Sequence, residues 1–448
     1  MSMEELQEQP RRRRSRKTDG ETTLTELDVA QMCAQDWHGR RVYDHRSGAW
    51  FIYQESGVWR ADKTEETVLD AQRICREAGT RFQELKRIRS AVTLARCQPW
   101  IGMTSDKFDA DRYLLGTPNG VVDLRTGQLT APRPEAYITK STAVAPNFRQ
   151  STPLWDAFMD QVTGRDHGVK RLLQQVFGYS LTGDTREQKL AFVYGPGRNG
   201  KGVFIRQMAG ILGAYAHRAQ PETFTKGLNR HPTEIASMVG KRLVFCSETE
   251  SGAPWAEARI KDITGGDTLT ARFMRQDEFE FRPEFKLVIS GNYAPQIEHA
   301  DEAMRNRFFV VPFDQVFAGE KADHKLDEKL QTEWPGILAW AIAGCLDWQR
   351  HGLLIPEKVR IATDQYFKDQ DVFKQWLETE TVAGGELSDR NTRLFQSWTA
   401  FAKENGELPG NAKQFAERLR RSGFSGPTVT RLNGEPCRVF RGLKALMQ

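Results

Sequence analysis

The stretch that decides the fold is Tyr194-Gly195-Pro196-Gly197-Arg198-Asn199-Gly200-Lys201-Gly202-Val203. The apolar run before it, residues 190–193, predicts a buried strand, and residues 203–208 have the apolar spacing of a helix. A strand, a glycine-rich turn, Gly-Lys and a helix together form the layout of a phosphate-binding loop. The glycines let the backbone curl so that successive N–H groups point at a phosphate, and the start of the helix adds its dipole.

This loop predicts an ATP site. Lys201 is expected to bring a full positive charge to the outer phosphates. The expected ATP-binding residues are Gly195, Pro196, Gly197, Arg198, Asn199, Gly200, Lys201, Gly202 and Val203. Gly202 departs from the usual pattern, in which a Ser or Thr hydroxyl binds Mg²⁺. A glycine turn with an incidental lysine is the alternative, but strand, loop and helix all favour the phosphate loop.

Composition indicates a protein of several domains. The chain has 448 residues, of which 39% are hydrophobic and 27% charged, with a net charge of +5. No apolar run approaches the about 20 residues that a membrane helix needs, so we expect a cytoplasmic protein without a membrane partner. The six cysteines lack metal-ligand spacing, which argues against structural zinc and disulfides.

Positive charge gathers at the two ends of the chain. Residues 386–448 hold eleven basic and six acidic side chains, an excess of five that equals that of the whole chain. Residues 11–17 form a basic run, Arg-Arg-Arg-Arg-Ser-Arg-Lys, in a polar tail. Both features suit a polyanion such as nucleic acid, although a solvated tail is an equal alternative for the first.

The predicted elements give an α/β fold class with a parallel sheet around the phosphate loop. We expect five parts: a disordered basic tail (1–22), an N-terminal α/β module (23–185), an ATPase domain (186–350), a helical linker (351–385) and a C-terminal domain (386–448). In the last part, helices over 392–404 and 412–421 precede a hairpin turning at Asn433-Gly434, an order that resembles a winged helix.

Polar side chains follow two further predicted strands of the ATPase domain. The second strand, residues 241–250, ends in Glu248 and Glu250, and the third, residues 285–292, ends in Asn292. One glutamate would hold Mg²⁺, directly or through water, and the other would orient the attacking water. The two roles stay open between these glutamates. Asn292 is expected to reach the γ-phosphate or the water, because ligands bind at the carboxyl ends of such strands.

Arginines occupy two other positions that suit phosphate contacts. Residues 268–281 predict a hairpin with Arg272 and Arg275 near its tip, in a position to contact a nucleic-acid backbone. A solvated hairpin edge is the alternative. Arg305 and Arg307 precede the predicted strand 308–313 and could act as fingers on the nucleotide of a neighbouring subunit.

These segments, in this order, resemble superfamily 3 helicases, and in particular the helicase half of phage and plasmid primase–helicase proteins. The resemblance rests on residues 192–204, 243–250, 260–267, 286–292 and 301–313, and extends into the flanks at 114–124, 137–140 and 177–184. It implies an AAA+ hexamer that hydrolyses ATP with Mg²⁺ and tracks 3′-to-5′ along single-stranded or forked DNA.

Site residues carry over from the family by position. The resemblance implies that Lys201 is the Walker A lysine, Glu248 and Glu250 the Walker B acids, Asn292 the sensor, Arg307 the finger with Arg305 next, and Arg272 and Arg275 the DNA-contacting hairpin. Gly202 and Asn306 depart from the family pattern, the first at the Mg²⁺-binding hydroxyl and the second beside the finger. Neither a primase catalytic domain nor a zinc knuckle is recognisable, so we expect a separate primase or polymerase polypeptide to prime.

The C-terminal domain is expected to bind DNA. Its basic candidates are Lys413, Arg418, Arg420 and Arg421 on the second helix and Arg431 on the wing. A domain of this kind could also only dock a partner protein, but its charge favours DNA.

The sequence therefore predicts a DNA helicase for phage, prophage or plasmid replication in the cytoplasm of a bacterial host. The alternative is an origin-binding initiator or loader that uses ATP as a switch without processive unwinding. A small-molecule kinase is disfavoured, because no acceptor site accompanies the phosphate loop.

Overall fold

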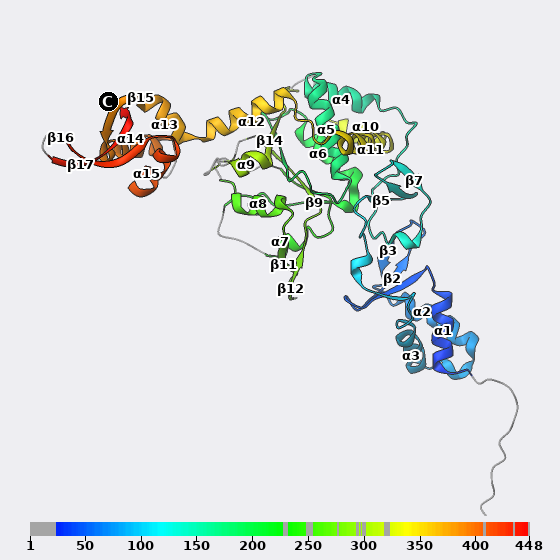
Figure 1. Ribbon diagram of the computed structural model, residues 1–448. Helices are drawn as coiled ribbons and strands as arrows, with labels where there is room; N and C mark the ends of the chain where they lie inside the picture. Colours follow the sequence, from blue (N-terminus) through cyan, green and yellow to red (C-terminus); the bar gives the residue numbers. More distant parts are fainter. Residues whose placement is uncertain are drawn as a thin grey trace, which may run out of the picture. The chain divides into compact units, whose positions relative to one another are not determined.

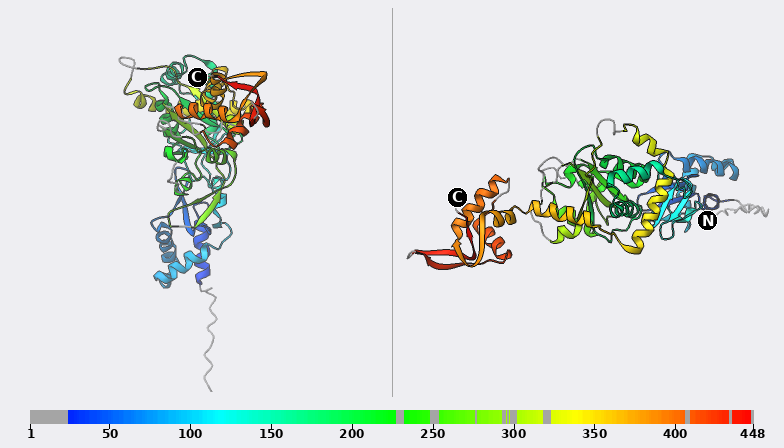
Figure 2. Two further views of the ribbon diagram at one scale, coloured as in Figure 1. Left: turned by 90° about the vertical axis from the view of Figure 1, so that its left-hand side faces the viewer. Right: turned by 90° about the horizontal axis from the view of Figure 1, so that it is seen from above.

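The computed structural model describes residues 24–226, 232–247, 254–275, 277–292, 295, 297, 302–317, 323–405, 409–432 and 435–446 (Figures 1 and 2). The chain divides into two compact units, one of residues 1–54 and 59–107 and one of residues 55–58 and 108–448. No helix among the described residues is both long and apolar enough to cross a bilayer.

The described part of the first unit, from residue 24 on, is a small sheet with three α-helices. Its elements are α1 (Glu26–Asp36), β1 (Arg41–Asp44), β2 (Ala49–Tyr53), β3 (Trp59–Ala61), α2 (Glu66–Ala78), α3 (Leu85–Ala95) and β4 (Gly102–Met103). The strands lie in the order β3-β2-β1-β4. Thr25 caps α1 through a capping box with Asp28, and the buried Trp37 and Ile74 belong to the hydrophobic core.

The second unit opens with a three-stranded meander and two helices. These are β5 (Leu114–Thr117), β6 (Gly120–Asp123), β7 (Gln128–Thr130), α4 (Pro153–Thr163) and α5 (His167–Ser180). We expected residues 23–185 to form one module, but the compact units divide near residue 107 instead. The reason is that α4 and α5 bury Trp155, Leu172 and Phe177 in one core with the residues that follow the phosphate loop.

A parallel sheet forms the centre of the second unit. Its elements are β8 (Leu190–Tyr194), α6 (Lys201–Leu212), β9 (Ala216–Arg218), α7 (Pro232–Ala236), β10 (Leu243–Ser247), α8 (Glu257–Gly265), β11 (Leu269–Arg272), β12 (Glu278–Phe281), β13 (Lys286–Gly291), α9 (Glu302–Arg307), β14 (Phe308–Pro312), α10 (Leu326–Gln331), α11 (Trp334–His351) and α12 (Glu357–Gln370). The strand order is β14-β8-β13-β10-β9, and all four pairs of neighbouring strands are parallel. All five strands therefore end at one edge, where their carboxyl ends meet.

Both faces of this sheet are covered, as its continuous apolar strands require. In β8, Ala191 and Val193 face one core, which also holds buried side chains of α5, α6 and α11. Leu190 and Phe192 face the other core, which holds buried side chains of α8, α9 and α12. Alternation along the strand thus sends successive side chains to opposite layers and fixes the register of β8 between β13 and β14.

The C-terminal elements form a cluster with a core of their own. They are α13 (Val372–Glu380), β15 (Thr381–Arg390), α14 (Asn391–Glu404), α15 (Ala412–Arg421), β16 (Ser425–Leu432) and β17 (Glu435–Ala445), with strand order β15-β17-β16 (orange to red in Figure 2). Trp376, Trp398 and Phe415 fill the core. Residues 382–385, the end of the predicted helical linker, lie within β15, where Val382 and Ala383 pair with β17 before an irregular stretch that ends at Ser388. The predicted turn at Asn433-Gly434 lies outside the described residues.

Candidate functional site

The loop between β8 and α6 curls tightly, and two of its glycines, Gly195 and Gly200, are needed for that path. Gly195 has φ 155°, and a Cβ there would lie 2.2 Å from the Phe313 carbonyl oxygen. Gly200 precedes α6 with φ 87°, and a Cβ there would lie 2.6 Å from Val162. Arg198 also has a positive φ, 62°. The backbone is therefore in the curled conformation that the sequence predicted.

Hydrogen bonds to the end of the sheet hold this loop in place. The buried Asn199 amide donates to the Phe313 carbonyl oxygen at 2.8 Å, just beyond β14. The Phe317 N–H donates to the Arg198 carbonyl oxygen at 2.7 Å. Two adjacent residues of the loop, Arg198 and Asn199, are thus fastened to the segment that follows β14, which holds the loop against the sheet.

Lys201, the first residue of α6, points back into the loop. Its Nζ donates to the carbonyl oxygens of Gly195 at 2.6 Å and Pro196 at 3.1 Å, and to Asn199 Oδ1 at 2.9 Å. The residue is only 6% exposed, and this burial lowers the pKa of its ammonium group to about 8. The oxygens around the Lys201 ammonium group are neutral, so its positive charge is not compensated in the loop. A bound anion would supply the compensating negative charge.

Asn292 joins the same cluster from the neighbouring strand. Gly291, the last residue of β13, pairs with Tyr194, the last residue of β8. The two strands therefore end at the same height in the sheet. Asn292 follows directly, and its Oδ1 accepts from Lys201 Nζ at 3.0 Å. The structure thus brings together the phosphate loop and the predicted sensor at the carboxyl edge of the sheet, where ligands of open α/β sheets bind.

Arg206 occupies the space beside Gly202, a feature that sequence reasoning missed. A Cβ on Gly202 would lie 2.8 Å from Arg206 Nη1, because helical side chains lean toward the preceding turn. Asp327 of α10 holds this guanidinium at 2.6 Å. The signal available in the sequence was a glycine at 202 followed one helical turn later by an arginine.

The predicted acids Glu248 and Glu250 lie outside the described residues. Ser247, the last residue of β10, pairs with Ser290 in β13, so β10 ends at the same edge as the phosphate loop. Within the described ranges, no group of three or more His, Cys, Asp or Glu side chains is placed to hold a metal ion. The metal role of the two glutamates stays a prediction.

Arg305 and Arg307 lie at the opposite edge of the sheet from the phosphate loop. The two parallel strands β14 and β8 pair from Phe308 with Leu190 to Pro312 with Tyr194, and the arginines precede the first pair. Five residues of strand separate that edge from the loop by roughly 16 Å. A single subunit therefore keeps Arg307 away from its own Lys201.

The two arginines differ in their own surroundings. Arg307 Nη1 donates to the Ala303 carbonyl oxygen at 3.1 Å, and Lys189 Nζ donates to the adjacent Asn306 carbonyl oxygen. Arg305 is 3.6 Å from Asp364, and its guanidinium lies 4.8 Å from the centre of the Phe367 ring. Arg305 is thus occupied on the surface of α12.

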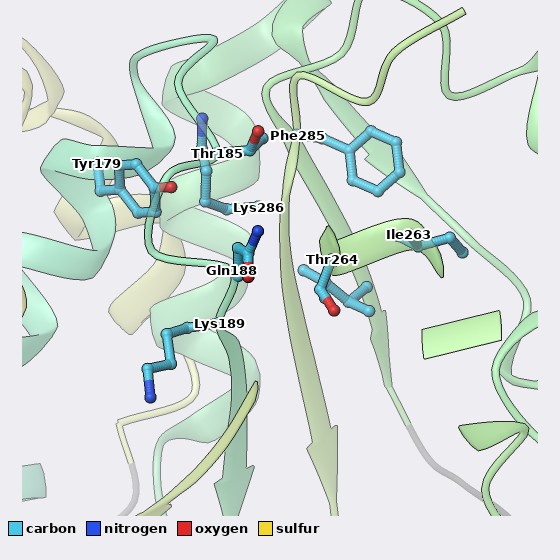
Figure 3. A pocket seen from close by; sticks show the side chains of 9 residues that line it. Tyr179, Thr185, Gln188, Lys189, Ile263, Thr264, Phe285 and Lys286 are labelled. Atoms are coloured by element: carbon cyan, nitrogen blue, oxygen red, sulfur yellow. The ribbon is translucent and has the colours of Figure 1, made fainter. Parts of the chain in front are cut away.

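A small pocket lies at this far edge, between the start of β13 and α8 (Figure 3). Its lining includes Tyr179, Gln188, Lys189, Thr264 and Lys286. The cavity volume of about 10 Å³ has room for about one water molecule, which excludes a nucleotide. Lys286 Nζ donates to the carbonyl oxygens of Asp184 at 3.2 Å and Glu284 at 3.1 Å, so it has a structural role there.

The hairpin β11–β12 forms at the predicted position. Arg272 pairs with Glu278 across the two strands, and Arg275 lies at the tip with a positive φ of 61°. Both arginines are exposed. Between them the exposed Phe273 and Met274, which sequence reasoning did not single out, are apolar. Their signal in the sequence was a pair of large apolar residues at a predicted turn.

The C-terminal basic residues divide into two kinds. Lys413, Arg420 and Arg421 of α15 and Arg431 of β16 are exposed, and Arg421 pairs with Glu417 at 2.7 Å. Arg418 is different, because its guanidinium lies 4.5 Å from the Phe373 ring centre and 5.1 Å from that of Trp398. Arg418 therefore packs on the core of the C-terminal cluster.

Two segments of the chain match known protein families. Residues 30–164 match the family described as "D5 N terminal like", and residues 193–307 match a family of unknown function (DUF5906). The second match covers the phosphate loop, the hairpin and the two arginines before β14.

Viral proteins are among the curated relatives. "Putative helicase L207/L206" of Acanthamoeba polyphaga mimivirus is 26% identical over 342 residues, which cover 68% of this chain and 34% of that protein. "Putative helicase 022R" of Frog virus 3 (isolate Goorha) is 30% identical over 273 residues, which cover 54% of this chain and 27% of that protein. "Primase D5" of Fowlpox virus (strain NVSL) is 23% identical over 184 residues, which cover 37% of this chain and 23% of that protein. The chain spans about a third or less of the length of these relatives.

Among solved structures, the apo A form of the NrS-1 C-terminal region has a similar fold. It superposes with a TM-score of 0.52 at 13% sequence identity, and the match covers 93% of this chain and 99% of that one. At this identity the likeness concerns the fold alone.

Proposed function

Because this chain belongs to the primase–helicase family, we propose that it is an ATP-dependent DNA helicase of the superfamily 3 type that serves phage, prophage or plasmid replication. The observation that carries the proposal is the position of Lys201 Nζ, which lies between the phosphate loop and Asn292 at the carboxyl edge of a parallel sheet. Lys201 would neutralise the γ-phosphate, and Asn292 would position the phosphate or the attacking water.

We assign the central sheet to the AAA+ class of P-loop ATPases. When β8, β9, β10, β13 and β14 are numbered 1 to 5 in chain order, the strands lie across the sheet in the order 5-1-4-3-2, with the phosphate-loop strand β8 inside the sheet. The hairpin inserted between β10 and β13 also suits a helicase of this class. These features support the assignment together with the order of motifs.

A ring of subunits, expected to be a hexamer, is supported by the position of Arg307. Its own phosphate loop lies at the other edge of the sheet, so the guanidinium would act on the nucleotide of a neighbour. ATP would then be hydrolysed between subunits. Arg305 is the less suited of the two, since Asp364 and the Phe367 ring engage it.

Magnesium would be held by Glu248 or Glu250, which follow β10 toward the edge that carries Lys201. When bound, the ion supplies charge stabilisation at the β- and γ-phosphates. Gly202 contributes no hydroxyl, so these carboxylates, water and the phosphates would provide its ligands. The remaining glutamate would orient the attacking water.

DNA contacts are assigned to two places. Arg272 and Arg275 of the hairpin would bind the backbone of the strand that the ring tracks, with 3′-to-5′ polarity. The C-terminal cluster has the element order helix, strand, helix, helix, strand, strand, which supports a winged helix. Its exposed Lys413, Arg420, Arg421 and Arg431 would load the protein onto forked DNA, and a separate primase or polymerase polypeptide would prime.

The second candidate is an initiator or loader that uses ATP as a switch, which the basic C-terminal cluster favours. Strand displacement separates the two functions. The helicase account predicts ATP-dependent release from a fork with a 3′ tail and little release from one with a 5′ tail. ATP hydrolysis stimulated by DNA, without release from either fork, would instead favour the initiator.

A further inference from the structure

The β11–β12 hairpin carries a row of three phenylalanine rings, of which Phe273 and Phe279 are stacked and Phe279 and Phe281 are tilted. The centres of the Phe273 and Phe279 rings are 5.1 Å apart with an interplanar angle of 19°, and those of Phe279 and Phe281 are 6.2 Å apart. Phe281 and Leu269, at the base of the hairpin, pack against the core beneath the sheet. The row thus runs from the core to the tip and ends at Phe273.

The end of this row is exposed. Phe273 is 41% exposed and the next residue, Met274, is 76% exposed. Figure 1 shows the hairpin extending from the second unit beside α7. Large apolar side chains at a projecting tip lose the burial that would stabilise the fold, so they point to a binding role.

The charges around the tip identify the kind of partner. Exposed arginines stand on both sides of the apolar pair, Arg272 before it and Arg275 after it. The other side of the hairpin is acidic, with Asp277 just before β12 and Glu278 and Glu280 within it, and these carboxylates would repel a phosphate backbone. A polyanion with flat apolar groups would therefore lie along the β11 side. Single-stranded DNA has this chemistry, with phosphates for guanidinium groups and base faces for an aromatic ring.

We propose that Phe273 and Met274 contact the bases of single-stranded DNA while Arg272 and Arg275 bind the flanking phosphates. The inference rests on the proposed function and adds base contact to a hairpin assigned only phosphate contacts. Stacking on Phe279 fixes the Phe273 ring in advance, which lowers the entropy lost on binding. Since every base has a π-face, the contact would be tolerant of sequence, as a translocating enzyme requires.

Fluorescence anisotropy tests this with two probes, oligo-dT and an oligonucleotide of the same length in which abasic sites replace the central bases. The wild-type full chain is expected to bind oligo-dT more tightly. Phe273→Ala is expected to weaken binding to oligo-dT about tenfold and to leave the abasic probe unaffected. Phe273→Trp, which keeps an aromatic face, should retain the preference, and Met274→Ala should reduce it in part.

Arg272→Ala is the matched control. It should weaken binding to both probes by the same factor and reduce the slope of log affinity against log salt concentration by about one counterion. Phe273→Ala should leave that slope unchanged. If Phe273→Ala keeps wild-type thermal stability but loses the same affinity for both probes, this inference is overturned and the proposed function is not affected. Failure of the wild type to bind either probe would count against the proposed function itself.

Discussion

Lys201 Nζ lies 3.0 Å from Asn292 Oδ1, although 91 positions separate the two residues in the sequence. The contact exists because β8 and β13 are adjacent and end level with each other. It joins the phosphate loop to the residue predicted as a sensor, so a phosphate bound by Lys201 would also lie beside Asn292. Five expected outcomes test this site and the elements around it.

The first concerns Gly202. We expect Gly202→Ser to fold and to retain ATP hydrolysis with a lower Mg²⁺ requirement, because a new Cβ meets only the movable end of Arg206. Titration of activity with Mg²⁺ measures the effect. Gly200→Ala is the contrasting variant, with φ 87° and Val162 at 2.6 Å, and should lose about 1–3 kcal/mol of stability. Misfolded Gly202→Ser would show that the glycine is needed for backbone shape.

The second concerns pH. Burial lowers the pKa of Lys201 to about 8, and a bound nucleotide favours the charged form. Below pH 8 the ammonium is charged with or without nucleotide, so affinity should change little through this group. Above pH 8 binding must take up a proton, and Kd should rise by about tenfold per pH unit. Lys201→Arg, which stays charged, should lose this slope, and a wild-type affinity flat to pH 9.5 would refute the assignment.

The third concerns hydrolysis between subunits. Arg307→Ala should lower the ATP hydrolysis rate by about 10³-fold, the usual worth of an arginine finger. Mixed with Lys201→Ala, it should recover part of the activity, because some interfaces then pair an intact loop with an intact finger. Arg305→Ala should have a much smaller effect, since its side chain contacts Asp364 and Phe367. Mixtures no more active than the two parent proteins would contradict shared sites.

The fourth separates packing from DNA binding in the C-terminal cluster. Arg418→Ala should destabilise the cluster by about 1–2 kcal/mol, because the guanidinium covers Phe373 and Trp398. Arg420→Ala should leave the unfolding temperature unchanged and weaken DNA binding, with a salt dependence reduced by about one counterion. Thermal unfolding and binding at several salt concentrations measure both. The reverse pattern would assign the DNA contact to Arg418.

Local patterns predicted the elements around the site well. The helix predicted over 412–421 is α15 (Ala412–Arg421), and the hairpin predicted over 268–281 contains β11 and β12. A strand before the loop and a helix after it also formed as expected, since turn, period and charge agree there.

Features that depend on distant partners escaped prediction. Residues 382–385 end the predicted helical linker, but they lie within β15, where Val382 and Ala383 pair with the distant strand β17. The split near residue 107 arises because α4 and α5 pack against helices more than a hundred residues later. The roles of Arg206 and Arg418 depend on which groups their guanidinium groups contact in the folded protein. Spacing along the sequence does not specify these contacts.

The fifth prediction tests the central claim most directly. Strand displacement on a 3′-tailed fork is measured with the wild type and with Lys201→Ala under the same ATP and Mg²⁺ concentrations. The account predicts ATP-dependent release by the wild type and at least about a hundredfold less by Lys201→Ala, because the variant loses the charge that stabilises the transferring phosphoryl group. Release by Lys201→Ala at a rate near that of the wild type would contradict the account.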